Sequence, residues 1–73
     1  MDEIDEQIMA VLHSSARPIK AKLIAAELRK MTGKTITTTE VNQRLYGATF
    51  KGLLVQDGQF GWRIFGKGRN RIG

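Results

Sequence analysis

The sequence predicts a mainly helical α+β fold in which three helices are followed by a C-terminal β-hairpin. Two observations lead to this prediction. Apolar residues recur at helical spacing in three successive segments up to about residue 51, and two short apolar runs then flank an Asp57-Gly58 dipeptide. With 73 residues the chain can bury one small core, so we expect a single domain.

The first predicted helix runs from Asp2 to about Ser14. Asp2 suits the N-cap position, because its carboxylate can accept hydrogen bonds from the free N–H groups of the first turn. Pro18 prevents a longer helix, since the residue before a proline is disfavoured in the helical region, and Ile19 is expected to form a brief extended segment. The apolar stripe of this helix consists of Ile4, Ile8, Val11 and Leu12.

The second predicted helix runs from about Lys20 to Met31. Gly33 follows it and can adopt the left-handed conformation that commonly ends a helix. The connector after this glycine contains Ile36, which we expect to point into the core. The apolar stripe of the second helix consists of Ile24, Leu28 and Met31, with Leu23 and Ala25 beside it.

The third predicted helix covers about residues 37–51 and has the clearest start. Thr37 and Glu40 match a capping box, in which Thr37 accepts a hydrogen bond from the Glu40 amide and Glu40 reaches back to Thr37. Phe50 leaves two alternatives: either the helix ends near Gly47 and Phe50 turns into the core, which we favour, or Phe50 is exposed for a partner. The residues expected to face the core are Val41, Leu45 and Ala48.

The hairpin is predicted from Asp57-Gly58, a frequent two-residue turn. This turn pairs Gln56 with Gln59 and places one set of apolar side chains on a common buried face. That face consists of Leu53, Val55, Phe60, Trp62 and Ile64.

Three helices with such a hairpin form the winged helix-turn-helix layout. The second and third helices are the helix-turn-helix, and the hairpin is the wing. We assign residues 1–66 to this domain. Residues 67–73 follow Gly66, contain two more glycines, and carry basic side chains at alternate positions (Lys67, Arg69 and Arg71), so we expect a flexible basic tail.

The charge of the chain is unevenly distributed. The net charge is +5, but four of the seven acidic residues lie within the first six positions. From Gln7 onward there are twelve basic and three acidic side chains, a net charge of +9. This excess favours a phosphate-bearing partner, although charge that only keeps a domain soluble would give the same count.

Several functions receive no support from the residue types. The chain has no cysteine and one histidine, His13, which argues against a zinc site or a histidine-based triad. No glycine-rich phosphate loop follows a strand. We therefore expect no enzyme activity, no metal, no cofactor and no small-molecule substrate. No apolar run is long enough to cross a membrane, and an acidic start without cysteines suits a cytoplasmic protein.

From Thr37 onward the sequence resembles the Z-alpha family of winged helix domains, which bind left-handed DNA. The resemblance is carried by Glu40-Val41-Asn42, Leu45-Tyr46, Lys51-Gly52-Leu53 and Trp62-Arg63-Ile64. It implies that Asn42 bonds a phosphate, that Tyr46 stacks near a base, and that Trp62 supports the tyrosine. The pattern is also similar to small winged helix modules of bacterial DNA-processing proteins.

Two features depart from the Z-alpha pattern. Thr38 and Gln43 stand where that family often has lysine and arginine, and both of those basic residues meet phosphate. The Gln56–Gln59 turn also lacks the prolines that are usual in its wing.

Helical geometry also points to an outward polar face. Thr39, Gln43 and Tyr46 lie opposite the core-facing stripe, with Asn42 at the edge, and such groups can bond phosphates and base edges or remain solvated. Trp62 is expected to pack in the core and to offer its indole N–H at the rim. The residues predicted to contact nucleic acid are Lys34, Thr38, Thr39, Asn42, Gln43, Tyr46, Lys51, Trp62 and Arg63.

Together these features predict a module that binds double-stranded DNA by inserting the third helix and bracing with the wing, with RNA or left-handed DNA as further ligands to test. The alternative is a protein-interaction winged helix that belongs to a larger DNA-processing or regulatory protein. That role would use the acidic first helix or an exposed Phe50. Cations around the third helix and the wing favour the first function, whereas an exposed apolar patch would favour the second.

Overall fold

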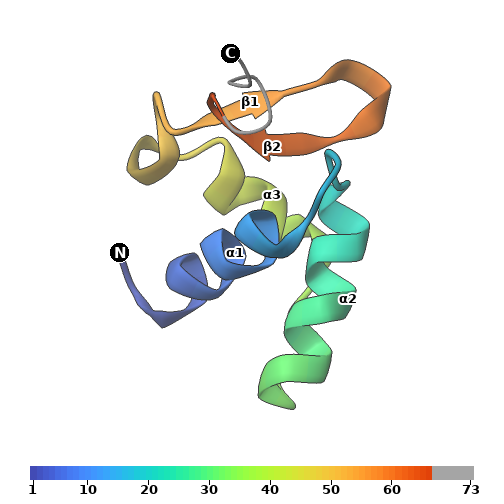
Figure 1. Cartoon of the computed structure of the whole chain (residues 1–73). Coiled ribbons are helices and arrows are strands. Elements are labelled where there is room, and N and C mark those ends of the chain that lie inside the picture. The colour runs from blue at the N-terminus through green and yellow to red at the C-terminus, as the bar shows by residue number, and fades with distance from the viewer. Residues whose placement is uncertain (67–73) are drawn as a thin grey trace.

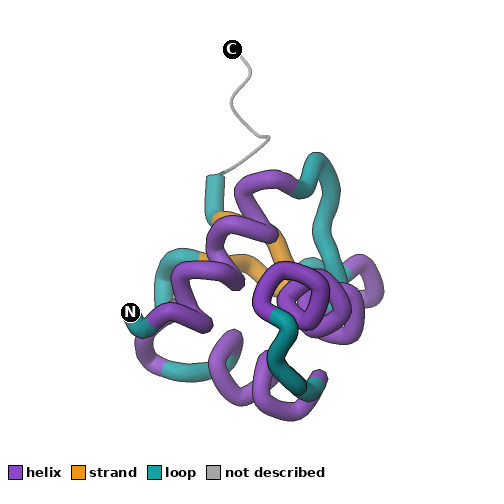
Figure 2. Tube along the Cα trace, turned by 90° about the horizontal axis from the view of Figure 1, so that it is seen from below, coloured by secondary structure: helices purple, strands orange, loops and turns teal. Residues whose placement is uncertain are grey.

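The computed structural model describes residues 1–66 and contains the predicted three helices and hairpin (Figure 1). The winged helix-turn-helix prediction is confirmed. The helices are α1 (Glu3–Ser14), α2 (Ala21–Thr32) and α3 (Thr38–Leu45), and the strands are β1 (Leu54–Gln56) and β2 (Trp62–Ile64). Figure 2 shows how little of the described chain is strand. The tail predicted for residues 67–73 lies outside the described residues.

The helix ends follow the local sequence closely. The Asp2 side chain accepts a hydrogen bond from the Asp5 N–H at 2.9 Å, and the Thr37 hydroxyl accepts one from the Glu40 N–H at 3.0 Å. Gly33 ends α2 in the left-handed region with φ 71°. These three predicted caps are confirmed because each depends on residues within one turn of the chain.

The core lies where the three helices meet and is closed by the wing. Ile36 is buried as predicted, whereas Leu23 and Met31 are about half exposed. The expectation that Met31 belongs to the core stripe is therefore wrong, because the last turn of α2 extends beyond the elements packed against it (Figure 1). The buried apolar residues are Ile8, Val11, Leu12, Ala21, Ile24, Ala25, Leu28, Ile36, Val41, Leu45, Phe50 and Trp62.

Helix α3 is shorter than the predicted 37–51. It ends at Leu45, with Tyr46 as its C-cap, and the backbone of Gly47 is extended before a short 3-10 helix at Ala48–Phe50. This break turns Phe50 into the core, where it is 2 % exposed, so the favoured alternative for Phe50 is confirmed. The same break leaves Ala48 exposed, and its predicted core position is wrong.

The wing has a different register from the predicted one. Leu54 pairs with Ile64, Val55 with Arg63, and Gln56 with Trp62, which leaves a five-residue loop at Asp57–Gly61. The predicted two-residue turn is wrong, because a 3-10 helix at Gly58–Phe60 occupies the loop.

The new register differs from the predicted one by three residues, and an odd shift exchanges the two faces of β1 relative to β2. Leu54 and Ile64 pack against the core, whereas Leu53 and Phe60 are 42 % and 61 % exposed. The predicted burial of Leu53 and Phe60 is therefore wrong. Only Trp62 and Ile64 of the expected face point to the core as predicted, and Val55 shares the outer face with Arg63.

A third extended segment attaches the wing to the helices. Ile19, predicted to be extended, forms a bridge to Trp62, with two backbone hydrogen bonds of 2.9 Å. Gly61 makes this approach possible, since its φ is 110° and a Cβ there would overlap the Ile19 carbonyl group. The bridge fixes the wing beside the start of α2.

Within residues 1–66, no helix is long and apolar enough to span a membrane.

Candidate nucleic-acid interface

The outward face of α3 is formed by Thr39, Asn42, Gln43 and Tyr46, as the helical spacing predicted. Thr39 and Gln43 are exposed, Asn42 is partly buried, and Tyr46 is 64 % exposed. Thr38 at the first turn is partly buried. An exposed tyrosine one turn from an amide gives this face both a ring for stacking and groups for hydrogen bonding.

Tyr46 and Trp62 form an aromatic pair. Their ring centroids lie 5.0 Å apart with an interplanar angle of 82°, which is the edge-to-face arrangement. Trp62 is 7 % exposed and belongs to the core, so the exposed Tyr46 ring packs against a buried side chain. The contact therefore joins the end of α3 to the wing.

Trp62 also lines two shallow hollows. One, of about 370 Å³, lies between the end of α3 and β1 and includes Tyr46, Phe50, Lys51 and Leu54 in its wall. The other, of about 290 Å³, lies between the start of α2, α3 and the wing. We call it the amide hollow, and it is lined by Lys20, Ala21, Asn42, Gln56, Gly58, Gln59, Gly61 and Trp62.

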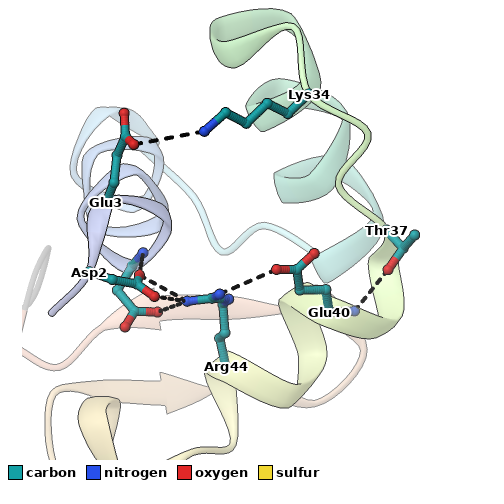
Figure 3. Close-up of polar contacts among 7 residues, drawn as sticks. Asp2, Glu3, Lys34, Thr37, Glu40 and Arg44 are labelled. Carbon is teal, nitrogen blue, oxygen red and sulfur yellow. Dashed lines mark hydrogen bonds and ion pairs between the residues drawn. The ribbon is translucent and has the colours of Figure 1, made fainter.

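The predicted cations differ in their surroundings. Lys51 is exposed and has no ion-pair partner among residues 1–66. Lys34 points toward Glu3 of α1, 3.9 Å away, and both side chains are largely exposed (Figure 3). Arg63 is partly buried on the outer face of the wing, with Nε 3.7 Å from Asp57 Oδ2. Of these three, Lys51 is the one that lines the hollow next to the aromatic pair.

Arg44 occupies the opposite side of α3 and forms what we call the Arg44 cluster, with Asp2, Asp5 and Glu40 (Figure 3). Its Nη1 lies 2.8 Å from Asp2 Oδ2 and 3.1 Å from Asp5 Oδ1, and its Nη2 lies 3.2 Å from Glu40 Oε2. Arg44 therefore pairs with two acidic side chains of the N-terminal segment and with one of its own helix. The predicted contact from the Glu40 side chain back to Thr37 is wrong, because the Glu40 carboxylate accepts a hydrogen bond from Arg44 instead.

The cluster shifts the acid–base properties of its members. Hydrogen bonds donated by Arg44 and by the Asp5 backbone stabilise the Asp2 carboxylate and lower its pKa. The pKa of Arg44 is raised, chiefly by the hydrogen bonds to Asp2. The Arg44 side chain therefore stays positively charged, and it forms ion pairs with three carboxylates of the same chain.

Residues 1–66 contain no grouping of three or more histidine, aspartate and glutamate side chains that could hold a metal ion.

Comparison with known families decides the assignment. The family model described as the ribonuclease R winged-helix domain matches residues 6–72, which is most of the chain. The chain belongs to the ribonuclease R winged-helix domain family. No curated protein and no solved structure matches it. Winged helix domains in general bind nucleic acids or mediate interactions. The resemblance to the Z-alpha family stays a prediction.

In this ribonuclease R winged-helix domain, sequence reasoning missed three residues of the amide hollow. Lys20 is the N-cap of α2, Gln56 is the last residue of β1, and Gln59 lies within the wing loop. The predicted two-residue turn made the two glutamines direct strand partners, so it could not place them around a hollow. The bridge between Ile19 and Trp62 brings Lys20 to the same place, and that contact spans more than forty residues.

Proposed function

We propose that the domain binds double-stranded nucleic acid through the outward face of α3 and the wing. The observation that carries this proposal is the aromatic pair. Tyr46 is 64 % exposed, yet its ring is held against Trp62 at 5.0 Å, one turn from Asn42. A large ring fixed in an exposed position is costly to keep for solubility alone, whereas a ligand that stacks on it makes use of that fixed position.

The charges beside the aromatic pair support the same partner. Lys51 lines the hollow on one side of Trp62, and Lys20 lines the amide hollow on the other. Among residues 1–66, neither lysine has an ion-pair partner, in contrast to Arg44 with its three carboxylates. Unpaired cations on both sides of an exposed ring suit a backbone with closely spaced phosphates.

Double-stranded DNA is the form that the shape of α3 favours. The major groove of B-form DNA admits a helix, whereas the corresponding groove of A-form RNA is too narrow for side chains to be read. The name of the family adds RNA, because a ribonuclease acts on RNA. Phosphate contacts are common to both duplexes, so the proposal is tested on both, with a left-handed DNA duplex beside them.

The test is a binding titration of the domain with each duplex at several salt concentrations. Neutralising about three to five phosphates gives a slope of roughly −3 to −4.5 for the logarithm of the binding constant against the logarithm of salt concentration on B-form DNA. Binding that is absent at low salt, or that does not change with salt, would contradict the proposal. A tighter complex with duplex RNA would retain the interface and replace DNA as the preferred ligand.

A protein-interaction role is the second candidate, and the outer face of the wing favours it. Leu53 and Phe65 are 42 % and 62 % exposed and are joined by a backbone hydrogen bond of 2.9 Å, with Val55 next to them. An exposed apolar set of this kind suits contact with another domain. This role moves ahead if no nucleic acid binds at low salt.

A further inference from the structure

The amide hollow has an unusual set of side chains. Three of the residues that line it have carboxamide side chains: Asn42 on α3, and Gln56 and Gln59 on the wing, with Trp62 in the same wall. Within residues 1–66, none of the three side chains has a hydrogen-bond partner, although Asn42 is partly buried. Three lining residues with unpartnered carboxamides suit a ligand that offers both donors and acceptors.

This chemistry distinguishes between the parts of a nucleic acid. A phosphate oxygen only accepts hydrogen bonds, so a site built for phosphate alone needs donors and not carboxamide oxygens. The edge of a base carries donors and acceptors together, and asparagine and glutamine bond such edges in pairs. The ring of Trp62 adds an aromatic wall. The hollow of about 290 Å³ lies at the lower end of small-ligand sites, roughly 300–1,000 Å³, which suits one base.

The position of the hollow is fixed by the fold. The bridge between Ile19 and Trp62 holds the wing against the start of α2, and Gly61 can carry no side chain without overlapping Ile19. The hollow is also next to the aromatic pair, because Trp62 belongs to both. A nucleic acid bound over Tyr46 therefore passes the mouth of the amide hollow.

We infer that the amide hollow binds one unpaired base of the nucleic acid, adjacent to the duplex that lies on α3. In a duplex the pairing edges of the bases are occupied, so only an unpaired base at an end or a bulge can offer its whole edge to the carboxamides. Lys20 at the rim is placed to meet the phosphate of that nucleotide. This inference rests on the proposed function and narrows its ligand to a duplex that carries an unpaired nucleotide.

The test compares two ligands and two kinds of variant. A blunt duplex and the same duplex with a short single-stranded overhang are titrated with the domain, using whichever of DNA and RNA binds more tightly. The parent is expected to bind the overhang ligand about threefold to tenfold more tightly, the gain from one or two hydrogen bonds. Gln59→Glu and Gln56→Ala are expected to lose this preference and to bind the blunt duplex within about twofold of the parent, except for some added repulsion in Gln59→Glu.

Gln43→Ala serves as the matched control, because it removes a glutamine from the outward face of α3 that does not line the hollow. It is expected to weaken both ligands equally and to keep the preference for the overhang. Gln56 and Gln59 are exposed, so thermal melting of their variants should match that of the parent. An equal affinity of the parent for both ligands, or a preference that survives in Gln56→Ala and Gln59→Glu, would overturn the inference and leave duplex binding intact. A parent that binds neither ligand would overturn the proposed function and this inference together.

Discussion

The two sides of α3 differ in how completely their polar groups are satisfied. On the side facing α1, Arg44 is bonded to Asp2, Asp5 and Glu40, and Asp5 is almost buried. On the outward side, Asn42 has no side-chain hydrogen bond within residues 1–66, and Tyr46 contacts Trp62 only by its ring. The side facing α1 connects α3 to the rest of the fold, whereas the outward side keeps polar groups that have no partner within residues 1–66.

This difference shows that a positive charge on α3 is not by itself a sign of nucleic-acid binding. Arg44 lies on α3, yet its guanidinium is paired with the carboxylates of Asp2, Asp5 and Glu40 in the same chain. Lys51 and Lys20, outside α3, line the hollows beside Trp62 and have no ion-pair partner within residues 1–66. We therefore expect stability and binding to respond to different substitutions on the two sides.

The largest effect is expected for Trp62→Ala, which removes the support of the outward side. Trp62 is 7 % exposed, pairs with Ile19 and contacts Tyr46, so its loss should lower the free energy of unfolding by about 3–5 kcal/mol. Thermal melting measures this, and Trp62→Phe should recover part of the stability. An unchanged melting temperature would show that Trp62 is not part of the core.

The next effect concerns the side facing α1. Arg44→Ala leaves the carboxylates of Asp5 and Glu40 without their partner and should lower the free energy of unfolding by about 1–3 kcal/mol. Lys30→Ala is the control, since its ion pair with Glu27 is exposed and should change stability by less than about 0.5 kcal/mol. Equal effects of the two variants would mean that the Arg44 cluster is ordinary surface charge. Duplex affinity at a temperature where Arg44→Ala is folded should match that of the parent.

On the outward side, Asn42→Ala and Tyr46→Ala should act on binding. Loss of a hydrogen bond from Asn42 or of stacking on Tyr46 is expected to cost about 1–3 kcal/mol of binding free energy each. Tyr46→Ala should lower stability by only about 1 kcal/mol, because the edge contact with Trp62 is its main packing. Titrations and melting curves in one low-salt buffer measure both quantities. Parent-like affinity in both variants would exclude α3 as the interface.

The smallest effect is a pH dependence that arises from Asp2. Its pKa is lowered in the folded domain by the hydrogen bonds from Arg44, so its contribution to stability is present above the ordinary pKa of about 3.9 and is lost as the pH falls through the lowered value. Asp2→Asn keeps an N-cap side chain and removes the charge. The melting temperatures of parent and variant should therefore converge as the pH is lowered from 5 to 2. A difference that stays constant over this range would contradict a role for the Asp2 charge.

The sequence predicted what depends on neighbouring residues. The caps at Asp2, Gly33 and Thr37 and the outward position of Asn42 and Tyr46 follow from spacing within a turn or two of helix. The wing register could not be predicted in the same way. Asp57-Gly58 is a good two-residue turn, but the packing of Leu54 and Ile64 on the core and the bridge from Ile19 to Trp62 outweigh that local preference.

The candidate site divides along the same line. Its helical half was predicted, whereas the amide hollow depends on three segments that meet only in the folded domain: the start of α2, α3 and the wing loop. Lys34 was expected beside the site because it precedes the third helix in sequence, but its side chain points toward Glu3 of α1. The sequence predicted where α3 begins, but it could not predict the direction of the Lys34 side chain that precedes it.

The most direct test of the account is a nuclear magnetic resonance titration of the isotope-labelled domain with a short duplex. We predict that the largest chemical-shift changes occur at Asn42, Tyr46, Lys51 and the Trp62 indole, and that Asp2 and Asp5 change little. That result would place the ligand on the outward side of α3 and leave the Arg44 cluster as a structural contact. Changes concentrated on α1 and the Arg44 cluster, with Tyr46 and Trp62 unaffected, would contradict the account.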